Sequence, residues 1–100
     1  MNKLFPQAKA GAIPMAISEL KNELDTVYSE MLSLFVKSME LNCEIGRENA
    51  KEGKPLSDRK REEEILEKAA ANSPQDMQNY SIELFRDIIR FSKQYYEEMK

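Results

Sequence analysis

Five polar side chains fall on helix faces that are otherwise apolar, and functional sites in helical proteins are built from such inward-pointing residues. Ser38 and Asn49 share one apolar pattern, Glu62 lies in a second, and Ser92 and Tyr96 lie in a third. Ser38 and Asn49 are eleven residues apart, which puts them on one helix face, about 20° apart in projection. Together these hydroxyl, amide, carboxylate and phenol groups could line one polar pocket between helices.

Each of these residues also has an ordinary structural interpretation. A helical serine often donates its hydroxyl to a carbonyl one turn earlier, and a glutamate near a helix start is often a cap or a partner of the helix dipole. Composition does not decide between a shared pocket and separate structural roles. The sequence has no histidine and one cysteine, which argues against a zinc site and excludes Cys–His or Ser–His catalysis within one chain.

The composition is typical of one soluble helical domain, with 41% apolar and 33% charged residues in a chain of 100. A net charge of −3 without blocks of like charge gives no indication of a nucleic-acid partner. No apolar run approaches the roughly 20 residues of a membrane span, and residues 1–16 make a poor signal peptide. We therefore expect a cytoplasmic protein without a membrane partner, in which Cys43 is a buried structural thiol.

One long helix, predicted from Pro14 to about Lys51, must position the first two polar residues. Its apolar seam recurs at intervals of four and three residues and is interrupted at Ser38; it comprises Leu20, Leu24, Val27, Met31, Leu34, Leu41 and Ile45. Such a helix is about 55 Å long, whereas a compact chain of this size has a radius of gyration of only about 13 Å. One chain cannot wrap it, so the sequence predicts a dimer. Gly46, in mid-pattern, indicates the close approach of another helix.

Two further helices complete an all-α fold in the order long, short, medium. Gly53 and Pro55 end the long helix, and Ser57 or Asp58 caps a second helix over 59–71. In the break that follows, we expect Ser73 to cap a third helix, with Pro74 in its first turn and Asp76 completing a capping box, and this helix to run to about Glu98. Residues 1–13 are predicted to be an irregular arm and residues 14–100 the helical domain.

Several segments resemble the all-helical chorismate mutases, the AroQ class. The resemblance covers about residues 18–98, and its most specific part is the Pro-x-x-Asp-x-x-Arg-Glu spacing from Pro55 to Glu62. The other matching segments are Leu20-Lys21-Asn22-Glu23-Leu24-Asp25, Met39-Glu40-Leu41, Glu44-Ile45-Gly46 and Leu84-Phe85-Arg86-Asp87-Ile88-Ile89. The resemblance implies an intertwined homodimer in which each active site takes one residue from the neighbouring subunit.

The resemblance also implies a reaction, the pericyclic rearrangement of the dianion chorismate to prephenate in aromatic amino-acid biosynthesis. That reaction requires no cofactor, metal, nucleophile or proton transfer. The enzyme holds a compact conformer of the substrate and stabilises negative charge on the breaking ether oxygen. Cations must clamp two carboxylates, and arginine suits this task because its planar fork matches a carboxylate.

Carried over residue by residue, the family's site is only partly present. Asp58, Arg61 and Glu62 match the family's loop aspartate, the arginine that follows it and the glutamate that holds the substrate hydroxyl. Ser92 matches a serine of the last helix. The neighbour's arginine corresponds to Lys21. The other correspondences place Ser38 at an arginine, Asn49 at the lysine near the ether oxygen, and Tyr96 at a glutamine or glutamate. Two of the four expected cations are therefore neutral, and the sequence offers no obvious replacement for them.

Four hypotheses follow from this mixture. The chain is an active or weakly active chorismate mutase, or a mutase-like dimer that has lost the reaction and serves as a binding or regulatory module. It could also be a lyase for isochorismate, which needs much the same cations, or a plain helical interaction module. The first two hypotheses separate on whether Ser38 and Asn49 line a pocket together with Arg61 and Glu62, and a plain helical interaction module would show no such pocket.

Overall fold

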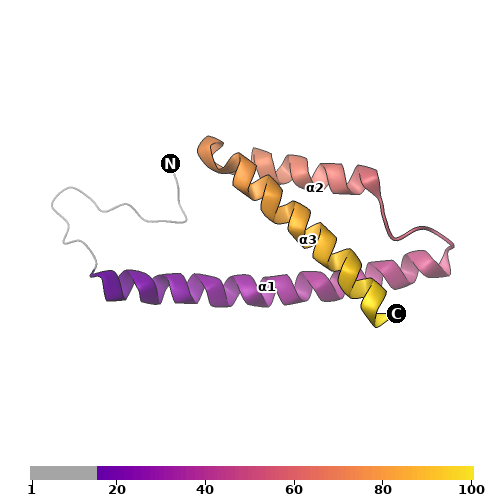
Figure 1. Cartoon of the computed structure of the whole chain (residues 1–100), viewed down its shortest axis with the longest axis horizontal. Helices are drawn as coiled ribbons and strands as arrows, with labels where there is room; N and C mark the ends of the chain where they lie inside the picture. Colours follow the sequence, from indigo (N-terminus) through magenta and orange to yellow (C-terminus); the bar gives the residue numbers. More distant parts are fainter. Residues whose placement is uncertain (1–15) are drawn as a thin grey trace. The chain divides into compact units, whose positions relative to one another are not determined.

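The computed structural model describes residues 16–100, and the predicted arm and Pro14 lie outside them. The described residues form α1 (Ile17–Lys51), α2 (Arg59–Ala71), a short 3₁₀ helix η1 (Gln75–Met77) and α3 (Gln78–Met99). Figure 1 labels α1, α2 and α3. Residues 16–100 contain no strand. The all-α prediction is confirmed, and α2 has the predicted bounds. The described residues divide into two compact units, 16–35 and 36–100.

In the unit of residues 16–35, the apolar seam is not buried. Every side chain from Ala16 to Leu34 is exposed. Leu24 and Val27 of this seam are 40% and 41% exposed, and Leu34 is 67% exposed. A seam with this spacing normally packs against another helix, and within this unit it has no such cover.

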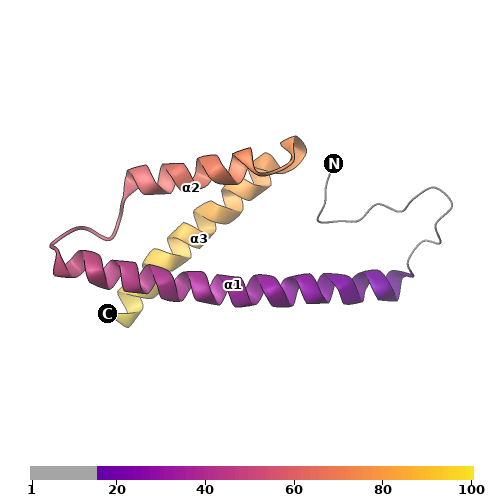
Figure 2. The ribbon, with the colours of Figure 1, turned by 180° about the vertical axis from the view of Figure 1, so that it is seen from behind.

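In the unit of residues 36–100, the buried centre is the place where α3 crosses α1, a crossing that is visible from both sides (Figures 1 and 2). Cys43 is 3% exposed and Tyr96 is 8% exposed, which confirms the prediction of a buried thiol. A Cβ atom placed on Gly46 would lie 2.7 Å from the Tyr96 ring. The ring therefore occupies the space that a side chain at Gly46 would need, and the predicted close approach at this glycine is confirmed.

The turns between helices follow local hydrogen-bonding rules with one exception. Gly53 adopts φ +71° after α1, and Asp58 caps α2 by accepting a hydrogen bond from the Arg61 N–H at 3.1 Å. The predicted cap at Ser73 is wrong. Its hydroxyl donates to the Ala69 carbonyl (2.7 Å) and is hydrogen-bonded to Ser81 (2.6 Å), so it closes the end of α2 and is not available to begin the next helix.

Substitution of Gly46 tests the crossing of α1 and α3. Gly46→Ala should lower the free energy of unfolding by about 1–2 kcal/mol, because overpacking against Tyr96 outweighs the better helix propensity of alanine. Chemical denaturation at a fixed protein concentration measures this change. In a Tyr96→Leu background the same substitution should cost less, since the ring that opposes the new methyl group is gone. A Gly46→Ala protein as stable as the parent would contradict the close approach.

Candidate active site

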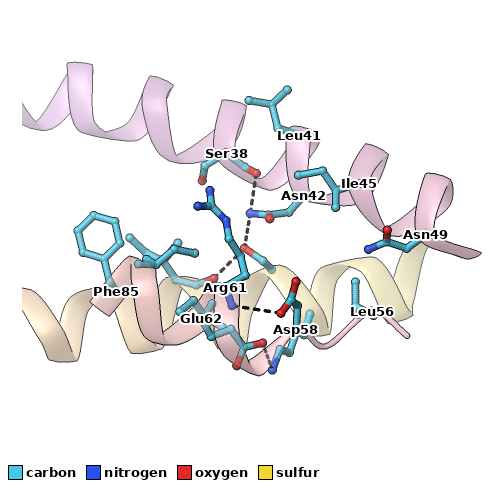
Figure 3. A pocket seen from close by; sticks show the side chains of 15 residues that line it. Ser38, Leu41, Asn42, Ile45, Asn49, Leu56, Asp58, Arg61, Glu62 and Phe85 are labelled. Atoms are coloured by element: carbon cyan, nitrogen blue, oxygen red, sulfur yellow. Dashed lines mark hydrogen bonds and ion pairs between the residues drawn. The ribbon is translucent and has the colours of Figure 1, made fainter. Parts of the chain in front are cut away.

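A cavity of about 580 Å³ lies within the unit of residues 36–100, and residues of all three helices line it (Figure 3). Its volume is within the range of pockets that hold small metabolites. Its polar and charged lining residues are Ser38, Asn42, Asn49, Asp58, Arg61, Glu62, Ser92 and Lys93. Its apolar lining residues are Leu41, Ile45, Leu56, Ile65, Phe85, Ile88 and Ile89.

The first turn of α2 brings two of the predicted site residues to the cavity. Asp58 begins the helix as its cap, and Arg61, one turn later, extends its guanidinium toward Ser38 on α1 (Figure 3). Among residues 16–100, no carboxylate lies within ion-pair distance of the Arg61 guanidinium. Arg61 therefore offers its full set of donors to a planar anion such as a carboxylate.

Glu62 lies in the same turn, and its carboxylate is bound from α3. The Lys93 ammonium lies 2.6 Å from Glu62 Oε2 and donates to Ser57 Oγ at 2.9 Å. Ser57 Oγ in turn donates to Glu62 Oε2 at 3.3 Å. Lys93 and Glu62 neutralise each other, and with Asp58 and Arg61 the lining side chains carry two positive and two negative charges.

Part of the cavity wall on α1 and α3 is a network of neutral groups. Asn42 Nδ2 donates to the Ser38 carbonyl (2.9 Å) and to Ser92 Oγ (3.0 Å), and Ser92 donates to the Ile88 carbonyl (2.8 Å). Because a carbonyl can only accept, the Asn42 amide is fixed with its NH₂ group on Ser38 and Ser92. Ser92 is 6% exposed, and its hydroxyl hydrogen is already used within the protein.

The remaining predicted site residues differ in position. Asn49, near the C-terminal end of α1, lines the cavity. Tyr96 is not among the lining residues, and its hydroxyl donates to the Gly46 carbonyl at 3.2 Å. Lys21 belongs to the unit of residues 16–35, where it is exposed. The structure thus gathers Ser38, Asn49, Asp58, Arg61, Glu62 and Ser92 around one cavity.

Sequence reasoning did not find Asn42 and Lys93. Asn42 is one turn after Ser38, so its helical spacing was a usable signal. Lys93 follows Ser92 and resembles any charged residue on a helix surface. Its partner Glu62 is 31 residues earlier in the sequence, and nothing local to either residue indicates the pair.

Comparison with known proteins identifies the class. The chain belongs to the family described as chorismate mutase type II, which it matches over residues 20–97. This match spans the helices and the loop that form the cavity, and it confirms the resemblance to the AroQ class. Comparisons with curated proteins and with solved structures give no match.

Asn42→Asp tests the neutral network. A carboxylate cannot donate to the Ser38 carbonyl or to Ser92, so the substitution should lower the free energy of unfolding by about 1–3 kcal/mol at neutral pH. Asn79→Asp is a matched control, because Asn79 is exposed on α3 and the charge change is the same. Urea denaturation of the two variants distinguishes a local effect from one of net charge. Equal stability of both variants would count against the network.

Proposed function

We propose that the protein is a chorismate mutase with a weakened carboxylate clamp, acting in aromatic amino-acid biosynthesis in the cytoplasm. The observation that carries this proposal is the cavity, which combines Asp58, Arg61 and Glu62 with Ser38 and Asn49 of α1. These positions lie within the family match. A plain helical interaction module would have no reason to assemble them around a space of this size.

The lining groups account for part of what the rearrangement requires. Arg61 binds one substrate carboxylate, and Glu62 accepts a hydrogen bond from the substrate hydroxyl. Asn49 can donate an amide hydrogen to the ether oxygen, on which negative charge develops. The apolar walls hold the compact conformer of the substrate, because they limit the space in which its side chain can swing.

The same set of lining residues indicates an enzyme with a low rate. Ser38 is too short to replace an arginine, and Asn49 carries no charge. Loss of one oriented donor typically costs roughly 3 kcal/mol, or two to three orders of magnitude in rate. These two neutral residues also favour a second candidate, a dimer that binds a related ligand without converting it. Spectrophotometric loss of chorismate, with calorimetric binding alongside, separates the two candidates, because only the first gives turnover above the spontaneous rate.

A homodimer is part of this proposal. The apolar side chains from Ala16 to Leu34 are exposed within one chain, and within the other unit Leu41 and Ile45, which line the cavity, are 49% and 55% exposed. A second copy of α1 would cover this seam and could bring its Lys21 to the site as a further cation.

No helix within residues 16–100 is long and apolar enough to cross a membrane.

Restoring the two missing cations tests the assignment of the site. Ser38→Arg combined with Asn49→Lys should raise kcat/KM for chorismate by at least two orders of magnitude, because each cation supplies an oriented donor of the kind that is missing. The measurement is the initial rate of chorismate loss with the purified, folded protein.

Ser29→Arg combined with Ala50→Lys is the control for this experiment. It adds the same charges to α1 at exposed positions that do not line the cavity. This control should leave the rate unchanged. A folded Ser38→Arg, Asn49→Lys protein no faster than its control would refute the residue correspondence.

Substitution in the seam tests the dimer. Leu24→Glu should halve the mass measured by light scattering after gel filtration, because a buried unpaired carboxylate disrupts a helix–helix interface. Activity should fall with it, if the site is completed by the partner. Thr26→Glu, which adds the same charge to α1 off the seam, should leave the mass unchanged. A parent protein with the mass of one chain would refute the dimer outright.

A further inference from the structure

Lys93 is a cation of the cavity that the family's pattern does not supply. It lies on α3 directly after Ser92, and its side chain is among those that line the cavity. Its ammonium group is held 2.6 Å from Glu62 and 2.9 Å from Ser57 Oγ. Lys93 therefore already lies beside the carboxylate that is expected to accept the substrate hydroxyl.

A dianionic ligand requires a second cation in this cavity. Asp58 and Glu62 bring two negative charges, and Arg61 is the only guanidinium that residues 16–100 contribute to the lining. Without Lys93, the lining side chains of one chain would carry a net charge of −1, and two ligand carboxylates would be repelled. The neutral wall formed by Ser38, Asn42 and Ser92 cannot offset that repulsion, because it supplies no positive charge.

The pairing of Lys93 with Glu62 can be exchanged at low cost. The Lys93 side chain is 35% exposed and that of Glu62 is 25% exposed, and ion pairs with access to solvent stabilise proteins only weakly. Lysine also carries its charge on a flexible four-carbon stem with rotatable donors. A ligand carboxylate that enters the cavity can replace Glu62 as the partner of the ammonium group without leaving a buried charge unpaired.

We propose that Lys93 is a ligand-binding residue that compensates for the arginine missing at Ser38. When a dicarboxylate enters, Lys93 exchanges Glu62 for a ligand carboxylate, and Glu62 is released to accept the hydroxyl of the same ligand. The inference rests on the proposed function for the identity of that ligand, chorismate. No covalent step is involved.

Lys93→Gln tests this role by removing the charge at nearly constant length. The dissociation constant and KM for chorismate should rise roughly tenfold or more, as expected for loss of a charge-assisted hydrogen bond, while kcat changes less. Lys93→Arg should retain most of the affinity. Arg86→Gln is the control, because it removes one positive charge from the same helix at an exposed residue that does not line the cavity.

The decisive comparison repeats Lys93→Gln in a Ser38→Arg background. If Lys93 stands in for the missing arginine, its removal should cost affinity in the parent protein and at most a few-fold when the arginine is present. A lysine that merely ties α3 to α2 would give the same loss in both backgrounds. That result, with all variants folded by circular dichroism, would overturn the proposal.

A second readout keeps this inference separate from the proposed reaction. If neither the parent nor the Ser38→Arg, Asn49→Lys protein converts chorismate, the mutase assignment fails, and nuclear magnetic resonance titration with malonate tests Lys93 alone. Malonate should shift the backbone amide signals of Arg61 and Lys93 in the parent and Arg86→Gln proteins, and much less in Lys93→Gln. No shift at Lys93 in the parent protein would overturn the inference.

Discussion

The contact between Tyr96 and the bare backbone at Gly46 is the constraint on which the rest of the 36–100 unit depends. Only a residue without a side chain lets the ring approach α1 so closely, and the hydroxyl bond to the Gly46 carbonyl sets the position of α3 along α1. One turn earlier on α3, Ser92 then meets Asn42. Lys93, the next residue, is turned by about 100° and meets α2. The crossing of α1 and α3 thus positions both the neutral wall of the cavity and the Lys93 ammonium group beside Glu62.

The electrostatics of the cavity follow from what occupies that wall. A guanidinium at position 38 would have to be accommodated beside the Asn42 and Ser92 groups, which are already bonded to each other and to backbone carbonyls. The protein has instead a hydrogen-bonded neutral network, and among residues 16–100 no buried polar side-chain atom lacks a partner, the condition under which buried polar groups are tolerated. The positive charge of the site is concentrated on α2 and α3, at Arg61 and Lys93.

Much of the fold could be predicted from the sequence because the signals are local. The end of α1 and the start of α2 follow from the apolar spacing, Gly53 and the Asp58 cap. Gly46 indicates a close helix approach from the sequence alone, although the sequence does not show that Tyr96 is the partner. The Ser73 cap was wrong because a hydroxyl at a helix end can serve either neighbour, and Ser81, eight residues later, decides the choice. The Lys93–Glu62 pair was not predictable, since it depends on how two helices pack and not on either helix alone.

The cap of α2 has a consequence for how the site forms. Asp58 is both the residue that starts the helix and a part of the cavity wall, and Arg61 and Glu62 occupy the turn that this cap closes. The ends of helices fray more readily than their middles. When this first turn unwinds, the cavity loses the wall that these residues form. A ligand bound in the cavity therefore stabilises the turn in its helical form. Occupancy of the site and order of this turn are then linked equilibria, and amide hydrogen exchange at the start of α2 should slow as the site fills.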